Sequence, residues 1–168
     1  MSKRQRQYVS ILIAIIFYYI IHEGAHYIAA ILYGTFKQIK FMGLGVQIDV
    51  YAESMSNMEI GIFCIAGAVA TLLVAWILVL LRETICKSSS KLGKAIFYYM
   101  TIAMMFIDPL YLSILCDLFG GGDMNGISFV IPELFSRIIF MVIMLVHILV
   151  FIKIVLPTYK KAFEKVER

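Results

Sequence analysis

The chain has 168 residues, of which 62% are hydrophobic and only 15% are charged, and its mean hydropathy is +0.91. Soluble domains are about half apolar and about a quarter charged. This composition therefore argues against a soluble globular fold, a disordered chain or a disulfide scaffold. The length accommodates about four membrane spans of roughly 20 residues each. We expect an all-α integral membrane protein.

Four long apolar runs predict transmembrane helices at about residues 8–33, 58–81, 95–119 and 134–156. One membrane domain would then cover residues 1–168. Gly34 is expected to end the first helix. The pair Asp108-Pro109 is expected to kink or break the third, because proline removes a helix hydrogen bond. Pro157 is expected to begin a charged tail.

Two connections between these spans have a distinct character. Residues 36–52 alternate apolar and polar side chains on either side of Met42-Gly43-Leu44-Gly45, which predicts a small β-hairpin between the first two helices. Residues 120–133 read as a Gly-rich connection.

Basic residues predict how the spans are oriented. Most of the 15 Lys and Arg residues fall where four spans would place them on one side of the membrane. They are Lys3, Arg4, Arg6, Arg82, Lys87, Lys91, Lys94, Lys153, Lys160, Lys161, Lys165 and Arg168. The positive-inside rule then predicts a multi-pass protein of the cell membrane with both termini cytoplasmic and the hairpin outside. The net charge of +4 reflects this topology, and we expect no nucleic-acid partner.

The first apolar run contains His22-Glu23-Gly24-Ala25-His26, an HExxH motif. On a helix the two histidines lie about 40° apart on one face and about 6 Å apart along the axis, so both can bind one metal ion. The metal would lower the pKa of a bound water toward about 7, and Glu23 would accept its proton as general base. Because polar residues inside a membrane are costly, they mark a functional site. We predict one Zn²⁺ ion.

A catalytic zinc site with two histidines needs a third protein ligand. The sequence leaves three candidates, which are Asp123, Asp117 and Asp108. Asp123 is preferred, because its Gly-rich surroundings allow the backbone to bring a short carboxylate to the metal. Asp117 is the second choice. Asp108 is also interpreted as the N-terminal cap of a helix that resumes at Pro109.

Two further polar residues receive milder interpretations. His147, in the fourth span, is expected to make an ordinary polar contact rather than to bind metal. Asn125 is expected to form a turn, with hydrogen bonding to a ligand or to a substrate carbonyl as the alternative.

Taken together, these features resemble the site-2 protease family of intramembrane zinc metalloproteases. The resemblance runs from about Ile11 to Gly126 and includes the HExxH motif in the first membrane helix, the hairpin, a small-residue second helix and a distal Asp. In that family the two histidines and the distal Asp bind zinc and the Glu is the base. These roles carry over to His22, His26, Asp123 and Glu23.

The chain departs from the family pattern in two motifs and in orientation. Ala66-Gly67-Ala68 keeps the Gly of a usual Gly-Pro pair but lacks the Pro, and Asp123 is not directly followed by Gly. The family's active site typically lies nearer the cytosol, whereas the basic residues predict the opposite side for His22 and His26.

The resemblance implies an intramembrane zinc metalloendopeptidase that cleaves a membrane-anchored protein or peptide within the lipid bilayer. The hairpin would then offer a strand edge to an extended substrate. The alternative is a non-catalytic membrane protein for metal binding or transport, which would not need Glu23. An inactive homologue that serves as a binding partner is disfavoured by the intact motif.

Overall fold

The computed structural model describes residues 1–42, 45–119 and 122–164. In chain order its regular elements are α1 (Lys3–Leu32), β1 (Phe36–Met42), β2 (Gly45–Val50), α2 (Asn57–Lys87), α3 (Lys91–Leu110), α4 (Gly122–Ile127), α5 (Glu133–Val150) and α6 (Leu156–Glu164). Short 3-10 turns cover Ala52–Ser54 and Cys116–Phe119, and π-helical turns cover Tyr111–Leu115 and Phe151–Val155.

Four stretches within the described residues are long and apolar enough to cross a membrane: Lys3–Leu32, Asn57–Lys87, Lys91–Leu118 and Glu133–Glu164. The predicted all-α fold, with four spans and a hairpin between the first two, is confirmed. Parts of the expected hairpin turn (43–44), of the Gly-rich connection (120–121) and of the tail (165–168) lie outside the described residues.

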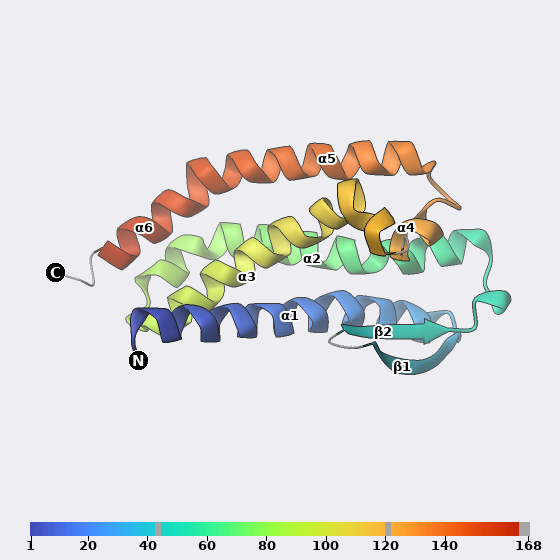
Figure 1. Ribbon diagram of the computed structural model, residues 1–168, viewed down its shortest axis with the longest axis horizontal. Helices are drawn as coiled ribbons and strands as arrows, with labels where there is room; N and C mark the ends of the chain where they lie inside the picture. Colours follow the sequence, from blue (N-terminus) through green and yellow to red (C-terminus); the bar gives the residue numbers. More distant parts are fainter. Residues whose placement is uncertain (43–44, 120–121, 165–168) are drawn as a thin grey trace.

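The helices lie lengthwise, so the molecule has two distinct ends (Figure 1). The N-terminus, the connection from α2 to α3 and the C-terminal helix α6 lie at one end. The hairpin, the short helix α4 and the start of α5 lie at the other. The basic segments that the sequence assigned to one side of the membrane are therefore gathered at one end of the molecule.

Serine caps explain why the helices begin before their apolar runs. Ser2 and Ser56 each form a capping box with the residue three positions later, and the Ser90 hydroxyl accepts a hydrogen bond from the Gly93 N–H. These side chains satisfy N–H groups that the first helical turn leaves unpaired. At the other end of α1, Gly34 has a φ of 68°, and the helix ends there as predicted.

The hairpin is antiparallel, with Ile39 opposite Ile48. Beside its strand ends, Asp49 accepts a hydrogen bond of 3.1 Å from the Gln38 amide and lies 3.6 Å from Lys37. The Gln38 amide and the Lys37 charge hold the pKa of Asp49 below its usual range. Ile48 is buried against Ala29, Ala30 and Phe63, so the hairpin is fixed to α1 and α2.

Two sequence predictions about the later part of the chain are wrong. The expected Gly-rich connection contains helix α4, and the expected tail after Pro157 is helix α6. Pro157 lies inside one continuous helical stretch from Glu133 to Glu164, and the π-helical turn just before it accommodates the proline. Val155 and Tyr159 are buried in the main core with α1, α2 and α3, and this packing extends the helix past the apolar run.

The third span is helical through Asp108-Pro109, and its irregular turns begin only at Tyr111. The predicted interruption therefore lies just after the proline. Proline lacks the N–H that would bond to the Met105 carbonyl four residues earlier. His147 supplies a replacement, because its Nδ1 lies 2.6 Å from that oxygen. The interpretation of His147 as an ordinary polar contact is confirmed.

We expect His147→Leu to lower the free energy of unfolding by about 1–3 kcal/mol, because the buried Met105 carbonyl loses its donor. In a Pro109→Ala background the backbone N–H is restored, so the same substitution should cost less. Unfolding in detergent of the wild type, both single variants and the double variant measures the difference. Equal losses in the two backgrounds would contradict this explanation.

Candidate metal centre

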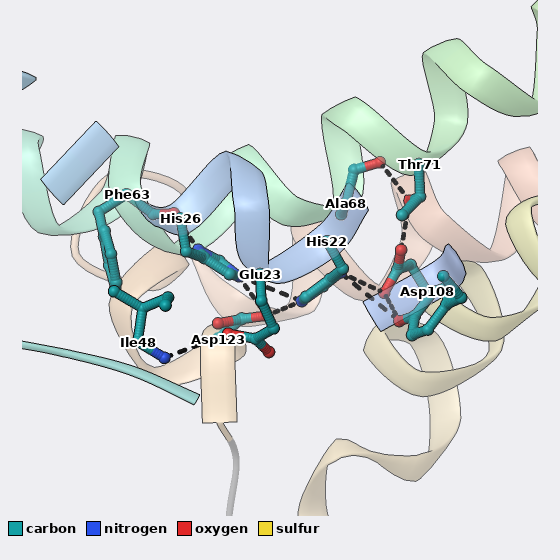
Figure 2. Close-up of polar contacts among 10 residues, drawn as sticks. His22, Glu23, His26, Ile48, Phe63, Ala68, Thr71, Asp108 and Asp123 are labelled. Carbon is teal, nitrogen blue, oxygen red and sulfur yellow. Dashed lines mark hydrogen bonds and ion pairs between the residues drawn. The ribbon is translucent and has the colours of Figure 1, made fainter. Parts of the chain in front are cut away.

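Three side-chain atoms from α1 and α4 converge on one point (Figure 2). The Nε2 atoms of His22 and His26 are 3.1 Å apart, and Asp123 Oδ2 lies 3.3 Å from the first and 3.6 Å from the second. Ligands of a tetrahedral zinc ion, with bonds of about 2.0–2.1 Å, are about 3.3–3.4 Å apart. The triangle therefore has the size of one face of a zinc tetrahedron.

Of the three acidic candidates for the third ligand, only Asp123 lies beside both Nε2 atoms in the part of the chain that the structure describes. Asp117 is exposed and pairs at 2.5 Å with Arg137, which also binds Glu133 at 2.6 Å. Cys116, Asp117 and Glu133 do form a second group of possible ligands. In that group the Arg137 guanidinium already neutralises the two carboxylates, in the place that a metal ion would take.

The opposite nitrogen of each imidazole ring has a polar partner of its own, and the Tyr18 hydroxyl also lies 3.5 Å from His22 Nδ1. His26 Nδ1 lies 2.7 Å from the Phe63 carbonyl oxygen, and His22 Nδ1 lies 3.2 Å from Asp108 Oδ1. When Nδ1 carries the proton and donates it, the Nε2 lone pair is free to bind metal. In that tautomer both rings direct an acceptor nitrogen toward Asp123.

Asp108 is buried inside α3, with 1% of its surface exposed. Its Oδ1 accepts a hydrogen bond of 2.5 Å from the Tyr18 hydroxyl, and the Thr71 hydroxyl donates to Oδ2. The interpretation of Asp108 as a helix cap is wrong, because α3 runs continuously through it. The carboxylate instead positions His22 from the side away from Asp123.

Helix α2 approaches the imidazoles closely at Gly67. A Cβ atom there would lie 2.6 Å from His26 Nε2 and 2.7 Å from His22 Nε2. A side chain at this point of α2 would require the imidazoles to move, so the small-residue segment of the second helix borders the site directly.

The apolar residues of α4 fix the position of Asp123 by packing against α2 and α5. Met124 and Ile127 are buried in a cluster with Ala68 of α2 and Phe140 of α5. A Cβ at Gly126 would lie 2.9 Å from the Cβ of Cys64, so α4 packs directly on α2. Asn125 is on the exposed side of this helix, where its backbone oxygen accepts a hydrogen bond from the Ser128 hydroxyl.

Glu23 faces the hairpin rather than the helix bundle. Its Oε2 accepts a hydrogen bond of 3.2 Å from the Ile48 N–H on β2 (Figure 2). The carboxylate also borders a cavity of about 370 Å³ between α1 and the hairpin. The rest of that lining is largely apolar and includes Tyr19, Ile20, Tyr27, Phe36, Ile39, Val46 and Ile48.

Sequence reasoning missed three of the groups that hold the site. Tyr18 is one helical turn before His22, and Thr71 is one turn after Gly67, so both spacings were visible in the sequence. Neither spacing indicates a role for its residue without the position of Asp108, to which both hydroxyls donate. The Phe63 carbonyl is a backbone group and leaves no signal in the residue types.

Comparisons of the chain with protein-family models, with curated proteins and with solved structures gave no significant match.

We expect Gly67→Ala to weaken zinc binding by at least about tenfold, because the added methyl group displaces the imidazoles. Gly24→Ala is the matched control within the motif, since a Cβ there meets no atom within 4 Å. Zinc titration of the purified variants checks both. Equal affinities for the two would contradict the close approach of α2.

The three aspartates should separate in the same titration. Asp123→Ala removes a ligand and should abolish tight binding, whereas Asp108→Asn should weaken it by about 10–100-fold, as expected for a residue that orients a ligand. Asp117→Ala should leave zinc affinity unchanged. Loss of zinc from the Asp117 variant, with retention by the Asp123 variant, would reverse the assignment.

Proposed function

We propose that this protein is a membrane-embedded zinc metalloendopeptidase that cleaves a membrane-anchored protein or peptide. The observation that carries the proposal is the convergence of His22, His26 and Asp123. Both imidazoles are held at Nδ1, on the side away from Asp123, and Glu23 directly follows His22 in the chain. Two nitrogens and one carboxylate oxygen are a donor set typical of catalytic zinc. The spacing of these atoms fits that ion.

Each residue has a distinct part in the proposed reaction. His22, His26 and Asp123 would hold the zinc ion, which would supply Lewis acidity toward a peptide carbonyl and a water molecule. Glu23 accepts the proton of the attacking water and then donates it to the leaving amine nitrogen. Asp108 lies beside the Nδ1–H of the neutral His22 ring and holds that ring in place.

The hairpin suits an extended substrate. Peptide carbonyls in a helix are shielded by their own hydrogen bonds, so a protease needs its substrate unwound. A strand of substrate that paired with the hairpin next to Ile48 would lie close to Glu23 and along the apolar cavity. The apolar lining of this cavity suits the side chains of a substrate segment that has unwound from a membrane helix.

The enzyme would lie in the cell membrane with both termini cytoplasmic. The basic residues at the end of the molecule that carries the two termini support this orientation. The metal centre would then lie toward the outer side.

Replacement of Glu23 by Gln tests the chemistry. Glu23→Gln should retain one zinc per chain but lower cleavage by about 10²–10⁴-fold, because the general base is lost while the ligands remain. The readout is mass spectrometry of new peptide termini in membranes that co-express the protein with a library of single-span fusion proteins. Glu53→Gln, an exposed residue near the same end of the molecule, is the control.

Undiminished cleavage by a zinc-loaded Glu23→Gln protein would refute the proposed mechanism. If the wild type binds zinc but yields no new termini, the alternative of a non-catalytic metal-binding or transport protein is favoured instead.

A further inference from the structure

A basic cavity lies at the opposite end of the molecule from the metal centre. It has a volume of about 400 Å³ and is bounded by the start of α1, the start of α3 and helix α6. Its charged lining consists of Lys3, Arg6, Lys91 and Lys160, with Glu164 as the one acidic residue. Tyr98, Tyr99 and Phe163 complete an aromatic wall.

The four basic side chains of this cavity form no ion pair within the described part of the protein, and Glu164 is the one acidic residue beside them. The ion pairs that Lys and Arg make within residues 1–42, 45–119 and 122–164 involve Lys37, Arg82 and Arg137, all outside the cavity. Four cations at one cavity repel one another. An anion bound among them would relieve that repulsion.

The helix ends add to the positive potential. Helices α1 and α3 both begin at this cavity, and neither has an acidic residue in its first turn. The partial positive charge of a helix N-terminus usually attracts Asp or Glu, yet these two helices begin with Lys3 and Lys91. The unfavourable placement is consistent with an anion supplied from outside the chain.

A buried lysine points to the same conclusion. Lys94 is only 2% exposed, and its Nζ lies 3.3 Å from the Ala162 carbonyl and 6.0 Å from the ring centroid of Phe163, on the cavity wall. A buried ammonium is costly without an opposite charge, and no carboxylate among the described residues pairs with it. The charge of Lys94 adds to the positive electrostatic potential of the cavity from behind Phe163.

A second basic hollow lies on another side of α6. Its volume is about 610 Å³, and its lining includes Arg82, Lys87, Lys153 and Lys161 with Glu83. Helix α6 therefore lies between two basic surfaces at the level where membrane spans end. That is the level of the lipid headgroups.

We propose that the cavity between α1, α3 and α6 binds the headgroup of an anionic phospholipid. Lysine and arginine would contact the phosphate, as in other basic pockets at the ends of membrane helices. The tyrosines suit the membrane interface, and Ala95, Leu156 and Phe163 offer apolar surface to the first part of the acyl chains. This site is separate from the metal centre and does not depend on the proposed protease activity.

Lipid titration of the full-length protein in a neutral detergent tests the proposal. Phosphatidylglycerol should raise the Tm of the wild type, because a ligand that binds the folded state stabilises it, whereas phosphatidylcholine should not. Arg6→Gln with Lys91→Gln should lose more than about half of that rise. Lys37→Gln with Lys40→Gln removes the same charge at the hairpin and should keep it.

The shift caused by lipid is compared within each variant, so a change in its basal Tm does not affect the result. If the double variant does not fold, native mass spectrometry of Lys160→Gln provides the second measurement, with fewer retained phosphatidylglycerol molecules expected. An equal lipid shift in both double variants would overturn the proposal. So would an equal rise with inorganic phosphate or with a polyglutamate peptide, because either would identify a site for soluble anions.

Discussion

The carboxylate of Asp108 joins three of the membrane helices. It belongs to α3, bonds Tyr18 and His22 of α1 through one oxygen, and bonds Thr71 of α2 through the other. In a medium of low dielectric constant such bonds are strong, and an unpartnered carboxylate would be very costly. Packing of α1, α2 and α3 that keeps these partners around Asp108 is therefore favoured. Because the same carboxylate also holds the His22 ring, the packing of the helices and the geometry of the candidate metal site both depend on Asp108.

The parts of this molecule that depend on local pattern could be predicted from its sequence. Long apolar runs define the spans, alternation defines the hairpin, and a spacing of four residues puts His22 and His26 on one face of a helix. These features need no knowledge of tertiary contacts. Asp123 was preferred as third ligand for the flexibility of its glycines, although a short helix seated by Met124 and Ile127 carries it in the structure.

The rest depends on contacts between distant segments. Asp108 is indistinguishable in sequence from a helix cap, because a cap and a buried hydrogen-bond acceptor share one residue type. Pro157 reads as a helix end, yet burial of Tyr159 keeps the chain helical past it. At both helical prolines a π-helical turn lies next to the proline, after Pro109 and before Pro157. The bundle accommodates each proline by a local change of helical pitch.

The hydrogen bond between Ile48 and Glu23 has a consequence for the order of events at the site. A backbone N–H has one hydrogen, which is best shared with one acceptor. In the structure that acceptor is the carboxylate of Glu23. A peptide carbonyl that took its place on the strand would leave the Glu23 carboxylate with one hydrogen bond fewer. A chain that docked on β2 would then take over the Ile48 N–H and release the Glu23 carboxylate in the same step.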